Sequence, residues 1–192
     1  RFTIGNYRTT ILEYLNESGA ISGWYKGKEY GEIWGLTTDR IMQDAGEDMP
    51  DQTFYYPTWG PGDIVYKDLD GNGVINEGSR TLEDHGDLSI IGNTTPKFNY
   101  SMSAGFKWKG FDFNMFWQGI GRRDFLPSTW SEYFWGLMAA PNNSGLFKGG
   151  RMLDYWRPAN ETNMLGANTD AYFPKPYFSN ERNKNIQNQS RY

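Results

Sequence analysis

Residues 96–119 read PKFNYSMSAGFKWKGFDFNMFWQG, and this stretch decides the fold. In its first half, apolar residues alternate with polar or small ones, and the apolar set is Phe98, Tyr100, Met102, Ala104, Phe106 and Trp108. After Gly110 the alternation restarts with Phe111, Phe113, Met115 and Trp117. Successive side chains of a strand point to opposite faces, so the pattern predicts two strands, 97–108 and 111–119, each with one apolar face. Lys109-Gly110 between them predicts a tight hairpin turn.

The length of this hairpin bears on whether it lies in a membrane or in a soluble domain. Strands of globular proteins usually run ~5–6 residues, whereas a strand that crosses a membrane in a β-barrel needs ~9–11. Aromatic residues gather near the strand ends, as they do in interfacial girdles, and the small polar residues opposite suit a wet lumen. A soluble β-sandwich hairpin with one face in a core would show the same alternation, so both structures stay open at this point.

A further strand and two long connections complete the expected layout. A weaker alternation predicts a strand over 2–15, and we expect extracellular loops at about 16–95 and 120–192, with short strands at 31–36 and 63–67. Tight turns that alternate with very long loops are typical of outer-membrane barrels. The predicted fold class is all-β: an antiparallel transmembrane β-barrel segment of a larger, plugged barrel. Three strands cannot close a barrel, so we expect most of it to lie outside this sequence.

Composition narrows the class of protein. Aromatic residues make up 17% of the chain although its mean hydropathy is -0.74, which suits a barrel with polar loops or a sugar-binding surface. The net charge of -4 without a basic stripe argues against a nucleic-acid partner. The chain has no cysteine, which excludes a disulfide scaffold and a thiolate metal site within it. No stretch approaches the ~20 apolar residues of a spanning helix.

An Asp-rich stretch, DLDGNGVIN at 68–76, has the spacing of a calcium-binding loop. Oxygen-bearing side chains stand at positions 1, 3, 5 and 9, and a glycine at position 6 allows the sharp bend that a hard cation requires. The predicted ligands are Asp68, Asp70, Asn72, Val74 and Asn76. Ser79 stands at position 12, where a bidentate acid is expected. Two interpretations therefore stay open: a Ca²⁺ site, or a metal-free turn held by side-chain to backbone hydrogen bonds.

Four blocks follow one another in an informative order: GEIWGLTTDRIMQ at 31–43, GDIVYKDLDGNGVIN at 62–76, IIGNTTPKFNY at 90–100 and KGFD at 109–112. This series resembles the region near the C-terminal end of SusC/RagA-type TonB-linked outer-membrane proteins of the Bacteroidetes. The resemblance covers roughly residues 27–125, and the insert at 82–89 departs from it.

The resemblance implies a large plugged barrel of about 22 strands in the outer membrane. It also implies import of oligosaccharides or peptides together with a SusD-like surface lipoprotein, with energy delivered through TonB and no organic cofactor. In the implied topology the strand over 2–15 runs outward, 97–108 runs inward, the Lys109-Gly110 turn faces the periplasm, and 111–119 runs outward again.

Aromatic residues of the second long loop are candidate ligand contacts, because exposed rings stack on sugars. We predict Trp130, Tyr133, Trp135 and Trp156 for this role, with packing inside their own loop as the alternative. The only histidine, His85, lies in an acidic loop, and no serine elbow, phosphate loop or zinc spacing is present. We therefore predict no catalytic residue and no enzyme activity.

The competing hypothesis is a secreted β-sandwich carbohydrate-binding module stabilised by Ca²⁺. It uses the same aromatic residues and the same Asp-rich loop, and it predicts that the chain folds alone without detergent. A glycosidase would need two inward carboxylates in a cleft, and the sequence offers no convincing pair.

Overall fold

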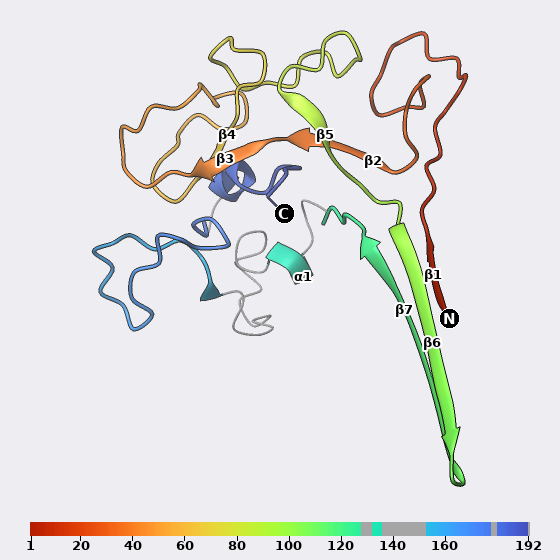
Figure 1. Ribbon diagram of the computed structural model, residues 1–192. Coiled ribbons are helices and arrows are strands. Elements are labelled where there is room, and N and C mark those ends of the chain that lie inside the picture. The colour runs from red at the N-terminus through yellow and green to blue at the C-terminus, as the bar shows by residue number, and fades with distance from the viewer. Residues whose placement is uncertain (128–131, 136–152, 178–179, 192) are drawn as a thin grey trace.

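A long antiparallel hairpin dominates the computed structural model, which describes residues 1–127, 132–135, 153–177 and 180–191. Strands β6 (Lys97–Trp108) and β7 (Phe111–Arg122) pair along their length and project away from the rest of the molecule (Figure 1). Strand β1 (Phe2–Gly5) lies along β6, which gives the sheet order β1-β6-β7. The sheet is open, and the described residues form no closed barrel.

The turn of the hairpin contains two residues, as the sequence predicts. Trp108 pairs with Phe111, and Lys109 and Gly110 between them have φ angles of 44° and 85°. Two consecutive positive φ values define a type I′ turn, whose twist matches that of the flanking strands. Glycine at the second position adopts this conformation without a steric penalty.

Strand β1 is shorter than the strand predicted over 2–15. It ends at Gly5, which lies opposite Asn99, two residues inside the start of β6 at Lys97. The chain then pairs elsewhere, and Ile11 donates its N–H to the carbonyl oxygen of Lys28 at 2.9 Å. The prediction of one long strand over 2–15 was wrong, because the chain leaves β6 after Gly5 and pairs with the segment around Lys28 instead.

Strand β6 occupies the residues predicted for it, whereas β7 continues three residues past the predicted end at Gly119. The extension follows from the register, because Lys97 at the start of β6 lies opposite Arg122. The hairpin therefore uses the whole length of β6.

The first long connection is a folded unit with four short strands. β2 (Glu32–Leu36) pairs with β5 (Leu88–Asn93), and β3 (Thr38–Ile41) pairs with β4 (Ile64–Tyr66). β2 and β4 match the short strands predicted at 31–36 and 63–67. β3 and β5 were not predicted, because four to six residues with mixed burial carry too little periodicity.

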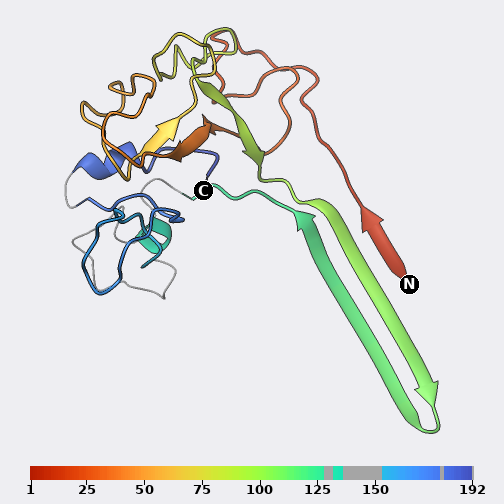
Figure 2. The same cartoon turned by 60° about the vertical axis from the view of Figure 1, so that its left-hand side comes forward.

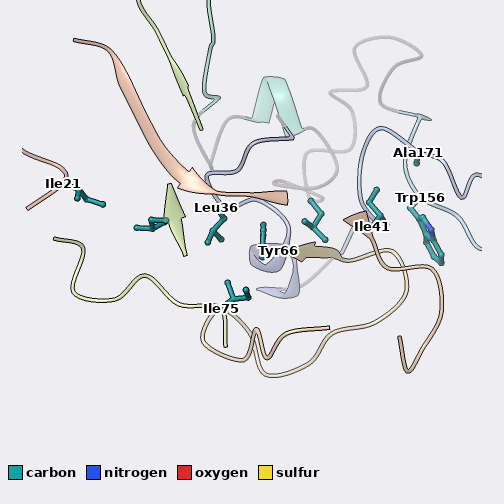
Figure 3. Packing of buried hydrophobic residues seen from close by; sticks show 9 residues of the cluster. Ile21, Leu36, Ile41, Tyr66, Ile75, Trp156 and Ala171 are labelled. Carbon is teal, nitrogen blue, oxygen red and sulfur yellow. The ribbon is translucent and has the colours of Figure 1, made fainter. Parts of the chain in front are cut away.

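One hydrophobic core joins the two long connections. Its buried members are Ile21, Leu36, Ile41, Ile64, Tyr66, Ile75, Leu88, Trp156 and Ala171 (Figure 3). Trp156 and Ala171 come from the second connection and the others from the first, so the two connections share this core. A smaller cluster, Trp135, Phe173 and Ile186, lies within the second connection beside the short helix α1 (Glu132–Trp135).

The segment that follows the 3-10 helix η4 (Asn180–Lys184) lies against β2. Leu36 donates its N–H to the carbonyl oxygen of Asn188 at 2.8 Å, and its own carbonyl accepts the N–H of Ser190 at 2.9 Å. The approach requires a glycine, because a Cβ on Gly35 would stand 2.7 Å from the carbonyl oxygen of Asn188. Among the described residues, no helix is both long and apolar enough to span a membrane.

Candidate functional site

The register of the hairpin gathers the apolar side chains of β6 and β7 on one face. Residues directly opposite each other in a sheet share a face. The apolar pairs are Tyr100 with Gly119, Met102 with Trp117, Ala104 with Met115, Phe106 with Phe113 and Trp108 with Phe111. Strand β1 extends the same face, because Phe2 lies opposite Met102 and Ile4 opposite Tyr100. We call this surface the apolar face of the sheet.

The apolar face is open to its surroundings. Trp108 is 66% exposed, Phe2 62% and Phe111 61%. The hairpin projects from the molecule in both views, so no other described element covers it (Figure 2). Within the face the rings of Phe106 and Phe113 stack on each other at 5.3 Å. An apolar surface of this extent is typical of a surface that contacts lipid or another protein.

The opposite face of the sheet is mostly polar. Lys107 and Asp112 form an ion pair at 2.8 Å near the turn, and further along Ser101 lies opposite Gln118. Phe116 and Ile120 are exceptions, because they lie opposite Ser103 and Asn99 on this polar side. The two faces of the sheet therefore differ in polarity, and the polar face suits contact with water.

The Asp-rich loop forms a compact turn on the surface. Asp68 accepts the N–H groups of Gly71 and Gly73 at 2.7 Å each, and Asn72 accepts the N–H of Val74 at 2.7 Å. These side-chain to backbone hydrogen bonds are the ones that the metal-free turn predicts. They leave further lone pairs on the carboxylate oxygens, so the geometry is compatible with both interpretations. Ca²⁺ binding by this loop stays a prediction.

Asp87 is the residue of this loop that sequence reasoning missed. It is fully buried, and its two oxygens accept the N–H groups of Leu69 at 2.7 Å and Asn76 at 2.9 Å. Ligand oxygens of Asp68, Asp70 and Asp87 lie within 4.8 Å of one another. Asp87 lies 18 positions from Leu69, whose N–H it accepts, and no loop motif has that spacing. A third carboxylate thus stands beside the loop although position 12 is Ser79.

The predicted ligand-binding aromatic residues lie in different environments. Trp135 is 2% exposed and packs in the smaller cluster. Trp156 is 4% exposed, packs in the main core, and donates its indole N–H to the side-chain oxygen of Gln43 at 3.0 Å. Buried rings cannot stack on a sugar in this conformation. Packing inside its own loop describes Trp135, whereas Trp156 packs mainly against residues of the first connection. Trp130 and the side chain of Tyr133 lie outside the described residues.

A cluster of charges links the sheet to the first connection. Glu29 pairs with Lys97 at 2.9 Å and with Arg8 at 3.0 Å. The hydrogen bond from Lys97, aided by the charge of Arg8, holds the pKa of Glu29 below its usual range. Asp124 accepts the N–H of Asn93 at 2.8 Å, and this bond lowers the pKa of that carboxyl. We call Arg8, Glu29, Glu32, Lys97, Arg122 and Asp124 the junction cluster.

Comparison with known proteins gives one distant homologue. The TonB-dependent receptor P3 of Formosa agariphila is 28% identical over 179 residues, which is 93% of this chain and 14% of that receptor. The chain thus spans about one seventh of the length of the curated relative that it matches. No model of a known protein family matches the chain.

Proposed function

We propose that this chain is a wall segment of a TonB-dependent outer-membrane importer of the SusC/RagA type. Its sheet stands in the bilayer with the apolar face toward lipid and the polar face toward the lumen. Its two long connections form a cap on the outer side. Transport would draw its energy through TonB, so the chain acts as a transporter part rather than as an enzyme.

The apolar face of the sheet carries this proposal. Its paired apolar residues lie on 12-residue strands, which are longer than the ~9–11 residues that a barrel strand needs to cross the hydrocarbon. Aromatic pairs at the turn end, Trp108 with Phe111 among them, correspond to an interfacial girdle. The distant homology to a TonB-dependent receptor supports the same assignment.

The substrate and partners follow from the resemblance in sequence. We propose oligosaccharides or peptides as cargo, a SusD-like surface lipoprotein as the outer partner, and TonB as the inner one. Buried Trp135 and Trp156 shape the cap rather than contact the cargo, which leaves Trp130 and Tyr133 as the proposed contacts.

The structure disfavours the secreted carbohydrate-binding module. A β-sandwich buries the apolar face of each sheet against a second sheet about 10 Å away. Among the described residues the apolar face has no such cover, and its largest rings are more than half exposed. In water this surface would promote aggregation.

The test is lipid contact in the native protein. Cysteine is placed at Met102 or, as the matched control, at the adjacent Ser103, and outer-membrane fractions are treated with a thiol reagent that partitions into lipid. We expect labelling at Met102→Cys and little at Ser103→Cys, because the two side chains lie on opposite faces. Equal labelling at both positions, or a protein of 22.1 kDa in the soluble fraction, would overturn the proposal.

A further inference from the structure

Lys184 is a buried lysine at the end of η4, far from the apolar face. Its side chain is 3% exposed, and its Nζ lies 3.2 Å from an oxygen of Asp63 and 3.2 Å from one of Glu181. Asp63 itself is 1% exposed. Burying two charges is costly unless they pair closely, so their partnership is required once the segment is in place.

Aromatic rings surround the ammonium group. The ring centroids of Tyr56, Trp59 and Tyr177 lie 5.1, 5.8 and 4.8 Å from Nζ. Rings at this distance attract a cation through their quadrupoles, most strongly where water is excluded. Tyr56 and Trp59 belong to the first connection and Tyr177 to the second, so the cage forms only when both connections are present.

Asn185, the residue after Lys184, also joins the two connections. The side-chain oxygen of Asn185 accepts the N–H of Ile64 at 2.8 Å, and its amide group donates to Asp63 at 2.9 Å. Tyr66 donates its hydroxyl to the carbonyl oxygen of Lys184 at 2.9 Å. A strand of the first connection therefore depends on residues about 120 positions away, as the separation of 121 between Ile64 and Asn185 shows.

We propose that Lys184 is a latch: its ammonium group, held in the cage, fastens the second connection to the first, so that the two move as one cap. The position of this cap at the outer mouth of a barrel rests on the proposed function. The latch itself rests only on the contacts between the two connections.

The test uses a cysteine at Gln189, which is 1% exposed beside Leu36 and reports on the seam between the connections. Gln189→Cys is introduced into the full-length protein, and the labelling rate by a water-soluble maleimide is measured in the fraction that contains the protein. Adding Lys184→Met leaves Asp63 buried without its cation, and we expect labelling to accelerate at least ~10-fold. The matched control is Lys67→Met, which removes an exposed lysine of the first connection and is expected to leave the rate unchanged.

A milder variant keeps the test informative where Lys184→Met unfolds the cap. Tyr177→Leu removes one wall of the cage, and we expect a ~3-fold acceleration while the first connection still resists thermolysin. Equal rates in Lys184→Met, Tyr177→Leu and Lys67→Met would overturn the latch. Lipid labelling at Met102→Cys reports on the proposed function separately, so either idea can fail without the other.

Discussion

Asp87 fixes both sides of the Asp-rich loop with one carboxylate. Its oxygens accept N–H groups on both sides of the Asp-rich loop, and it is completely buried. A buried carboxylate that makes two backbone hydrogen bonds holds the ends of a loop at a fixed separation. The loop's shape therefore depends on a residue outside the motif that attracts attention in the sequence.

Replacing Asp87 by alanine should destabilise the first connection by ~2–3 kcal/mol, because two partly buried N–H donors lose their acceptor. The measurement is the urea dependence of thermolysin cleavage within residues 16–95. Asp70→Ala is the control: Asp70 is exposed and bonds only within its own turn, so its loss should cost less than about 1 kcal/mol. Equal effects would show that Asp87 has no special role.

Calcium should stabilise the same connection if the loop is filled as its spacing predicts. We expect millimolar Ca²⁺ to raise the urea midpoint relative to EDTA, since an ion that binds the folded state shifts unfolding by mass action. Asp70→Asn removes one ligand charge and should abolish the increase. Equal midpoints of the parent protein in Ca²⁺ and EDTA would favour the metal-free turn.

At the scale of elements, the hairpin shows what sequence can predict. β6 and β7 alternate over 12 residues each and join through two residues, so local information specifies their extent, turn and faces. The strands of the first connection lack this advantage. β2 pairs with β5, and the contact between Thr37 and Ser89 joins residues 52 positions apart. Pairing at that range is decided by packing, which no local pattern reveals.

The two faces of the hairpin should differ in their tolerance of charge. On the proposed function, Met115→Lys places a charge toward lipid, and we expect a cost of roughly 2–4 kcal/mol near the bilayer midplane. Asn114→Lys, on the adjacent polar position, should be tolerated. The measurement is the urea midpoint of the folded barrel, read from its heat-dependent mobility on a gel. A similar loss for both variants would contradict the assignment of the faces.

At the scale of the whole molecule, the junction cluster connects the sheet to the cap. Glu29 and Asp124 have pKa values held below their usual range by the cations and N–H groups around them. A depressed carboxyl pKa means that the ionised form is stabilised in the folded protein. The resulting stability is present above pH ~4 and is lost as the pH falls through the lowered values.

We therefore expect the cap to become sensitive to urea below pH ~4. Glu29→Gln should lower the urea midpoint at pH 6 and weaken its decline toward pH 3, because one of the responsible carboxylates is gone. Tryptophan fluorescence follows the transition across this range. An unchanged pH dependence in Glu29→Gln would show that the junction cluster does not set it.

The candidate site, like the fold, has features that the sequence predicts and features that it does not. The apolar face could be predicted because it follows from strand alternation. The burial of Trp135 and Trp156 could not, because each ring is covered by residues that are distant in sequence. Asp87 was not predicted for the same reason. Residues whose role depends on a partner beyond the local element stay ambiguous until that partner is seen.

The shared core has a consequence for biogenesis. The burial of Leu36, Tyr66 and Ile64 is complete only when Trp156, Ala171 and Asn185 have been synthesised, and these residues follow at least 90 positions later. Contacts at such separations form slowly, since the intervening chain must first be ordered. The apolar residues of the first connection are therefore exposed until the second connection has been synthesised. On the proposed function, we expect periplasmic chaperones to bind them during this interval.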